Sequence, residues 1–246
     1  MGIENDTPIL TRDTNARREF LHSTAVAGAG LVMSGLAAGV FTAPLGASNS
    51  PSRKRDPFPT PQAALDALYK GNERFVKGEV MAPNRNMSRL KDVAAVQKPF
   101  AAFLGCADSR VPIEIVFDQG FGDLFVTRIA GNVADPAIIG SLEFGAEVLG
   151  TQVIYVLGHT RCGAVTATMT GSEVPGQIST LYQHIRRATK ESGGDVTKAI
   201  ARNVEIQAEI LKEASPVIAR RVKAGSLIIA GGVYDLDTGR VTPIPV

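Results

Sequence analysis

The stretch PFAAFLGCADSRVP, residues 99–112, contains both the pattern that decides the fold and the residues that point to a function. Its first half is a short apolar run that ends in glycine, a pattern typical of a buried strand. Similar runs recur downstream, at 123–131, 152–158 and 226–236. Helical patterns lie between these runs, at 137–150, 177–192 and 195–213. Strands that alternate with helices predict an α/β fold, with a mainly parallel sheet flanked by helices.

A single domain with a helical extension at its N-terminus is expected from residue 61 onward. Thr60 can cap a helix and Pro61 suits its first turn, so we predict a helix that ends at about Lys77. At the other end of the chain, the turn DTGR (237–240) leads into a last edge strand near Val241. The length of 246 residues fits this organisation.

The composition excludes some classes of protein. The formal net charge is +2, and no basic stripe is interleaved with aromatic residues, so nucleic acid is not an expected partner. Two cysteines do not make a disulfide framework. An apolar fraction of 44% is normal for a globular protein with a sizeable core.

The N-terminal part of the sequence has the pattern of an export signal. The basic segment NARREFLH (15–22) is followed by an uncharged run, rich in Ala and Gly, at 23–52. We therefore interpret 1–47 as a cleaved leader, 48–60 as a linker, and the mature protein as periplasmic or otherwise extracytoplasmic. An uncleaved membrane anchor is the alternative, because the uncharged run is long enough to span a bilayer.

The leader is similar to twin-arginine signals, which a dedicated export machinery reads. The pair Arg17–Arg18 carries this resemblance together with Phe20 and Leu21. The sequence departs from the pattern at Ala16, where Ser or Thr is usual, and at His22, where Lys is common.

Both cysteines lie next to the carboxyl ends of expected strands. Cys106 directly follows the run 99–105. His159 directly follows the run 152–158, and Cys162 comes three residues after His159. Ligand sites of parallel α/β sheets lie outside these strand ends, so the two stretches can converge although Cys106 and His159 are 53 residues apart. Two thiols and one imidazole suit zinc. Three ligands leave the fourth position to water, as in a catalytic site, or to the nearby carboxylate of Asp108.

Each of these residues also has a plainer interpretation. Buried free cysteines are common core residues. A histidine three positions before a cysteine is weak evidence by itself, and the Asp108–Arg110 spacing fits an ordinary surface ion pair. A redox pair is disfavoured because the cysteines are not in a CxxC arrangement. A metal site is favoured because both cysteines and His159 fall at two strand ends.

The paired motifs CADSRVP (106–112) and HTRCGAV (159–165) resemble those of the β-class carbonic anhydrases. The resemblance extends over about 61–246, the expected catalytic domain. Further matching segments are GNERFVKG (71–78), GDLFVTRIAGN (122–132) and GVYDLDTGR (232–240).

The resemblance implies a set of roles. Zn²⁺ would be held by Cys106, His159 and Cys162, and Asp108 with Arg110 would form the family's aspartate–arginine dyad. In the closed state known in part of the family, Asp108 would itself take the fourth metal position. The implied reaction is the reversible hydration of CO2 to bicarbonate and a proton by hydroxide on zinc. A homodimer or tetramer is implied as well.

One departure concerns bicarbonate regulation. Regulated members of the family bind an inhibitory bicarbonate through a tryptophan, an arginine and a tyrosine. Arg128 and Tyr234 match two of these residues, but Phe103 stands at the position of the tryptophan and lacks its N–H donor. This departure puts a regulatory site of this kind in doubt, and the sequence leaves open whether bicarbonate regulates the protein.

Two other functions remain open at this point. A hydrolase of CS2 or COS would use the same fold and the same zinc. A zinc-binding scaffold without turnover would keep the fold and lose the chemistry, but it would have no need of the Asp108–Arg110 dyad.

Overall fold

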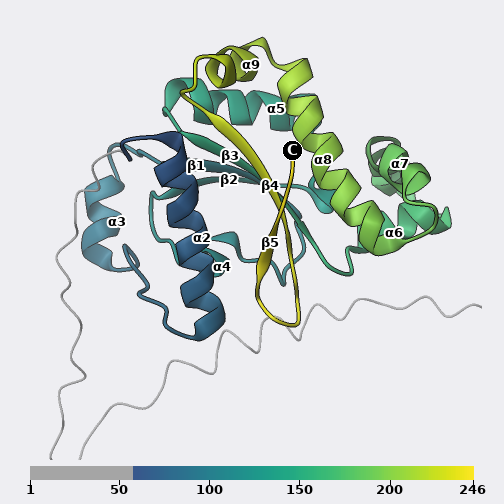
Figure 1. Cartoon of the computed structure of the whole chain (residues 1–246), viewed down its shortest axis with the longest axis horizontal. Helices are drawn as coiled ribbons and strands as arrows, with labels where there is room; N and C mark the ends of the chain where they lie inside the picture. Colours follow the sequence, from purple (N-terminus) through teal and green to yellow (C-terminus); the bar gives the residue numbers. More distant parts are fainter. Residues whose placement is uncertain (1–57) are drawn as a thin grey trace, which may run out of the picture. The chain divides into compact units, whose positions relative to one another are not determined.

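The computed structural model describes residues 58–246; the expected leader and residues 48–57 of the expected linker lie outside this range. A five-stranded sheet forms the centre of the described part (Figure 1). Its strands are β1 (Ala101–Gly105), β2 (Leu124–Arg128), β3 (Val153–His159), β4 (Ile228–Tyr234) and β5 (Val241–Ile244). Their order is β2-β1-β3-β4-β5; β5 is antiparallel to β4 and the other pairs are parallel. The predicted mainly parallel sheet is confirmed.

Helices cover both faces of the sheet (Figure 1). They are α2 (Pro61–Lys77), α3 (Met87–Val93), α4 (Ile113–Val116), α5 (Pro136–Glu143), α6 (Gly163–Thr170), α7 (Tyr182–Glu191), α8 (Val196–Ala214) and α9 (Pro216–Lys223). Shorter helical turns are η1 (Ala130–Asn132), η2 (Phe144–Val148) and η3 (Gly176–Leu181). No helix of the described residues is long and apolar enough to cross a membrane.

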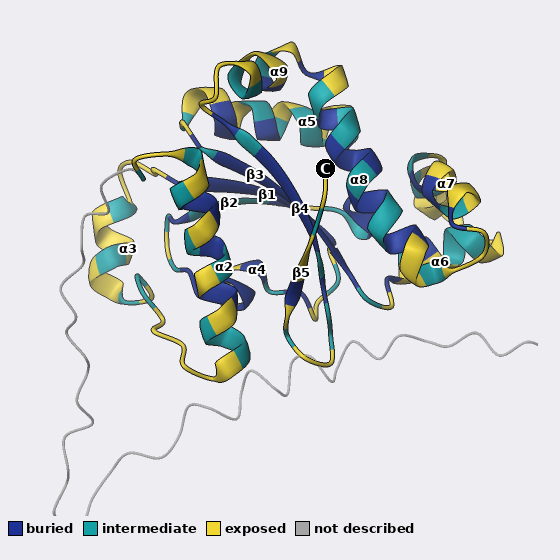
Figure 2. Ribbon diagram, viewed as in Figure 1, coloured by how far each residue is buried: buried dark blue, intermediate teal, exposed yellow. Residues whose placement is uncertain are grey.

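The alternation of side chains along the strands divides the core into two layers. On β1, Phe103 faces the layer that contains α2 and α4, whereas Leu104 faces the layer that contains α5, α8 and α9. The sheet and the inner faces of its helices are the buried parts of the molecule (Figure 2). Because β1 and β3 are buried on both faces, their sequences are continuous apolar runs without polar alternation.

The N-terminal helix follows its expected boundaries. The Thr60 side chain accepts a hydrogen bond from the amide of Ala63 at 3.1 Å, and Gly78 ends α2 in the left-handed region with φ of 72°. Two other segments differ from the prediction. The expected helix at 177–192 begins as the 3₁₀ turn η3, and the one at 137–150 ends in the π-helical turn η2.

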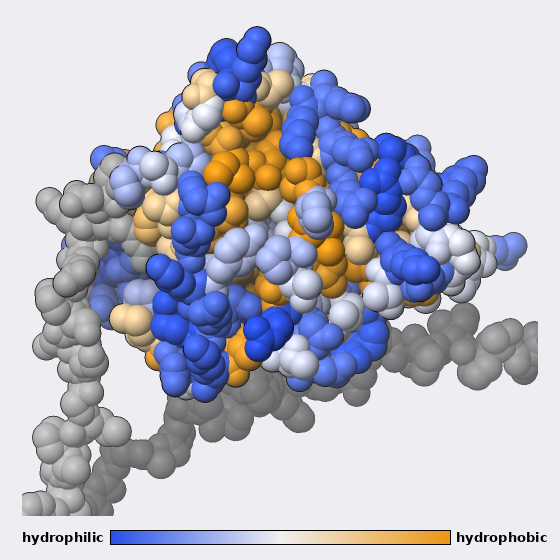
Figure 3. Space-filling view, in the orientation of Figure 1, coloured by the Kyte–Doolittle hydropathy of each residue, from blue (hydrophilic) through white to orange (hydrophobic). Residues whose placement is uncertain are grey.

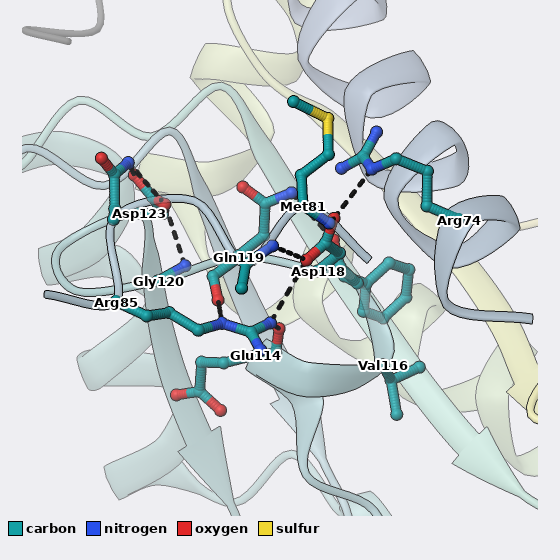
Figure 4. A network of polar contacts seen from close by, with 12 residues as sticks. Arg74, Met81, Arg85, Glu114, Val116, Asp118, Gln119, Gly120 and Asp123 are labelled. Carbon is teal, nitrogen blue, oxygen red and sulfur yellow. Dashed lines mark hydrogen bonds and ion pairs between the residues drawn. The ribbon is translucent and has the colours of Figure 1, made fainter. Parts of the chain in front are cut away.

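A buried carboxylate fastens the segment after α2 to the body of the domain (Figure 4). Asp118, which is fully buried, accepts hydrogen bonds from the amides of Met81 at 3.0 Å and Ala82 at 2.9 Å. The guanidinium of Arg74 donates to the same side chain at 2.7 Å, and that of Arg85 at 3.5 Å. This network holds the chain that leads into α3 against the loop between α4 and β2.

Candidate metal centre

Three metal-binding side chains meet at the carboxyl ends of two adjacent parallel strands. Cys106 is the first residue after β1, His159 is the last residue of β3, and Cys162 is the N-cap of α6. Their donor atoms all lie within 4.8 Å of one another, and all three residues are buried. The parallel pairing of β1 with β3 is what brings together residues that are far apart in the sequence.

The turn between His159 and Cys162 is fixed by the end of β4 and by the loop beyond it. The amide of Thr160 donates to the carbonyl of Tyr234 at 2.9 Å, and the Thr160 hydroxyl accepts from the amide of Leu236 at 3.1 Å. Arg161 lies in the left-handed region with φ of 56°. A tight reversal at Arg161 lets two ligands only three residues apart face the same point.

His159 presents one ring nitrogen with a free lone pair. Its Nδ1 is 3.0 Å from the carbonyl oxygen of Thr160, an acceptor, so Nδ1 carries the proton. Nε2 is buried and has no hydrogen-bond partner within residues 58–246. A buried nitrogen without a partner is costly unless it binds something. This tautomer, set by a backbone carbonyl, is typical of histidines that ligate metals.

The two thiols hold a proton between them. The pKa of Cys106 lies well below its ordinary value, chiefly because the Cys162 side chain donates a hydrogen bond to its sulfur; His159 and the amide of Gly131, at 3.3 Å, add to the effect. The pKa of Cys162 is raised by that same bond and by burial. Zinc requires thiolates, so its binding would displace the shared proton. The donor set of two sulfurs and one imidazole nitrogen fits Zn²⁺.

Asp108 and Arg110 form a close ion pair beside these donors. The Arg110 side chain donates through Nε to Asp108 Oδ1 at 2.9 Å and through Nη2 to Oδ2 at 2.7 Å, and its amide donates to Oδ1 at 2.9 Å. These bonds hold the pKa of Asp108 well below its usual range. Asp108 Oδ2 lies 3.9 Å from His159 Nε2. An ionised carboxylate therefore stands next to the unpartnered nitrogen.

Two of the residues linked with bicarbonate regulation, Phe103 and Arg128, make other contacts. Phe103 is fully buried in the core, with its ring 5.0 Å from that of Phe117 and 5.4 Å from that of Tyr155. Arg128 donates to the carbonyl oxygens of Cys106 and Asp108. Sequence reasoning did not find this use of Arg128, because a side chain that bonds backbone carbonyls leaves no pattern of residue types.

A small cavity adjoins the turn that carries His159 and Cys162. It has a volume of about 320 Å³, and it is lined by Thr160, Arg161, Thr166, Val196, Thr197, Ile200 and Val233. It lies on the α8 side of the turn, and none of the three metal-binding side chains lines it.

Comparison with known proteins agrees with the geometry. The family model described as carbonic anhydrase matches residues 101–241. The chain is 41% identical over 192 residues to carbonic anhydrase 2 of Mycobacterium tuberculosis, an alignment that covers 75% of this chain and 93% of that protein. The β-carbonic anhydrase of Coccomyxa, solved in complex with acetazolamide, superposes with a TM-score of 0.57 at 30% identity and covers 62% of this chain and 75% of its own.

A more distant structure shares the fold. One of two tetrameric β-carbonic anhydrases from Sordaria macrospora superposes with a TM-score of 0.60 at 22% identity, covering 64% of this chain and 86% of that one. The family model covers more than half of the chain, and the mycobacterial relative is matched over nearly its whole length. The chain belongs to the β-class carbonic anhydrases.

Proposed function

We propose that this chain catalyses the reversible hydration of CO2 to bicarbonate and a proton. The observation that carries the proposal is the position of the Asp108 carboxylate, 3.9 Å from the unpartnered Nε2 of His159 in a buried Cys–His–Cys donor set. A purely structural zinc site closes with four protein ligands. Here three donors and an arginine-held carboxylate leave a place for a reacting water.

Three residues would hold the metal: Cys106 and Cys162 through their thiolates, and His159 through Nε2. Bound zinc supplies a Lewis acid that makes a water acidic enough to provide hydroxide near neutral pH. The Nε2 of His159 stays available for the metal because Nδ1 carries the ring proton and donates a hydrogen bond to the carbonyl oxygen of Thr160. The thiolates of Cys106 and Cys162 add two negative charges, which lower the acidity of that water relative to a site of three neutral histidines.

Asp108 would orient the nucleophile. An ionised carboxylate only accepts hydrogen bonds, and Arg110 keeps Asp108 ionised. By accepting the proton of the attacking oxygen in a hydrogen bond, Asp108 turns the lone pair of that oxygen toward CO2. The new C–O bond forms as one π pair of CO2 moves to oxygen, bicarbonate departs, and the replacing water releases a proton to solvent. When released from Arg110, Asp108 would instead occupy the fourth metal position and exclude water.

Activity is expected to rise from about pH 6.5 toward about pH 9, because two thiolate ligands should place the pKa of the reacting water above the value of about 7 found in three-histidine sites. Stopped-flow CO2 hydration on protein with its zinc quantified measures this profile. One zinc per chain with no turnover at any pH would contradict the proposal.

The same preparation separates the rival functions. Sulfide release from CS2 or COS, with little CO2 hydration, would indicate the sulfur hydrolase. Absence of both activities, with zinc bound, would indicate a non-catalytic scaffold. The Asp108–Arg110 pair supports the enzyme, because a scaffold gains nothing from an ionised carboxylate beside the donors.

We also propose that residues 1–47 direct export by a twin-arginine route, which places the enzyme in the periplasm or elsewhere outside the cytoplasm. The proposal rests on Arg17–Arg18 and the uncharged run at 23–52.

Replacing both arginines with lysine should retain the protein in the cytoplasm, whereas the wild-type chain should appear outside it with a new N-terminus near residue 48. Fractionation and N-terminal sequencing test this. A wild-type protein found in the cytosol with its leader intact would contradict export, and one held in the membrane would indicate the retained anchor.

Finally, we propose that the chain forms a homodimer or tetramer. Exposed apolar side chains support this, since monomers rarely expose large contiguous apolar surface. Among them are Val80, Met81, Met87, Leu90, Val96, Ile115 and Phe121, between 40% and 72% exposed. Figure 3 shows hydrophobic residues gathering in the middle of the face in view, between the hydrophilic residues of α2 and α8. Light scattering on the purified chain measures its oligomeric state.

A further inference from the structure

Arg128, the last residue of β2, makes two hydrogen bonds that the proposed reaction does not explain. Its Nε donates to the carbonyl oxygen of Cys106 at 2.9 Å, and its Nη2 donates to the carbonyl oxygen of Asp108. We propose that Arg128 is a positioning residue: by holding the backbone on both sides of Ala107, it sets where the Asp108 carboxylate stands relative to the metal-binding donors. The inference rests on the proposed function for its catalytic consequence.

The chain needs such a donor at this point because the sheet ladder ends there. The pairing of β1 with β2 stops at Gly105 opposite Arg128. Beyond it, Ile129 donates to Gly105 at 3.1 Å and Ala107 donates to Ile129 at 3.3 Å. The Cys106 carbonyl belongs to a residue that is only 4% exposed, and a buried carbonyl requires a donor. The Arg128 guanidinium provides that donor.

Arg110 cannot perform the same task. It lies two residues from Asp108 on the same loop, so its bonds to the carboxylate fix the side chain within the loop and do not connect the loop to the sheet. Arg128 lies on a strand whose register with β1 is fixed. The two arginines therefore hold the two ends of Asp108: Arg110 holds the carboxylate and Arg128 holds the backbone.

The shape of the side chain matters as well as its charge. A guanidinium presents several N–H groups in a rigid plane and can bond two carbonyls at once, whereas a lysine ammonium is a compact charge on a flexible stem. Arg128→Lys keeps the positive charge, but it is not expected to bond the carbonyl oxygens of Cys106 and Asp108 at the same time. Arg128 is exposed, so Arg128→Met creates no buried cavity that could unfold the domain.

The test compares Arg128→Lys and Arg128→Met with the wild-type full chain. The control is Arg221→Met, because Arg221 also donates to a carbonyl, that of Ala146, at a distance in the fold from the metal centre. In metal-free protein, hydrogen exchange is expected to accelerate at 105–111 in both Arg128 variants and to stay unchanged there in the control. In the zinc-loaded protein, kcat/KM for CO2 hydration is expected to fall about 10- to 100-fold, the usual effect of losing a partner that orients a metal site. Zinc content should remain at one per chain.

Two results would overturn the inference. One is wild-type exchange at 105–111 together with wild-type kcat/KM in Arg128→Lys or Arg128→Met. The other is an acceleration of exchange spread evenly over the whole domain, which would make Arg128 a general contributor to stability. If the wild-type chain fails to hydrate CO2, the proposed function fails, while exchange in the metal-free protein still decides whether Arg128 holds the loop.

Discussion

Replacing His159 with alanine is expected to remove bound zinc and to lower kcat/KM for CO2 hydration by about 10⁴-fold or more, since enzymes of this kind owe rate enhancements of about 10⁶ or more to an intact site. The imidazole is the nitrogen donor of the set, and its buried Nε2 has no other partner within residues 58–246. Without it, zinc would meet only two sulfurs that share a proton. Metal analysis by mass spectrometry and stopped-flow kinetics measure both effects.

Two further variants make the His159 experiment decisive. His159 is fully buried, so the alanine variant leaves a cavity that could impair folding. His159→Gln is therefore tested beside it, because glutamine is closer in volume to histidine. Asp108→Asn is the matched control within the same site: it should keep one zinc per chain while losing about 10²- to 10³-fold in kcat/KM, because it removes a group that orients the reacting proton. A His159 variant with full zinc and full activity would rule out the metal centre, and an Asp108→Asn variant with wild-type rates would rule out the role of the carboxylate.

Much of the fold could be predicted because the buried strands are continuous apolar runs. β1, β2 and β4 lie inside the runs that were expected to be strands, and β3 extends one residue beyond its run, to His159. α2 has the expected bounds because Thr60, Pro61 and Gly78 mark its ends. Four helices were not predicted: α3, α4, α6 and α9. They have eight residues or fewer, and a helix this short shows little periodicity.

The residues of the candidate site also separate into those that the sequence predicts and those that it does not. Cys106, His159 and Cys162 could be grouped in advance because residue type and position after a strand both point to them. Arg128 could not, since its partners are backbone carbonyls. Asp118 could not either: Arg74 lies 44 residues from it and Arg85 lies 33 residues from it, and no local spacing predicts pairs so distant. Side chains that bind across the fold become visible only when the fold is known.

Asp118→Asn is expected to destabilise the domain by about 1–3 kcal/mol, as is usual when buried hydrogen bonds to a charged group are lost. Each group that bonds the Asp118 carboxylate is a donor: the amides of Met81 and Ala82 and the guanidinium groups of Arg74 and Arg85. Figure 4 shows Met81, Arg74 and Arg85 around the carboxylate. An asparagine NH2 placed among them finds no acceptor, and the negative charge is lost. Asparagine tolerates the left-handed backbone of residue 118, φ 47°, so the loss reflects the network and not backbone strain.

Thermal unfolding at matched protein concentration measures this loss, which corresponds to a fall in Tm of roughly 2–12 °C for a domain of this size. Glu147→Gln is the control, because Glu147 pairs with Arg220 at 2.8 Å on the surface, where both side chains are exposed and an ion pair contributes less than about 1 kcal/mol. Because the network fastens the segment after α2, trypsin should also cut at Arg85 faster in Asp118→Asn than in the control. A Tm and a cleavage rate equal to those of the control would mean that the segment is held by its other contacts, such as the bonds of Asn84 to Asp123 at 2.9 and 3.0 Å.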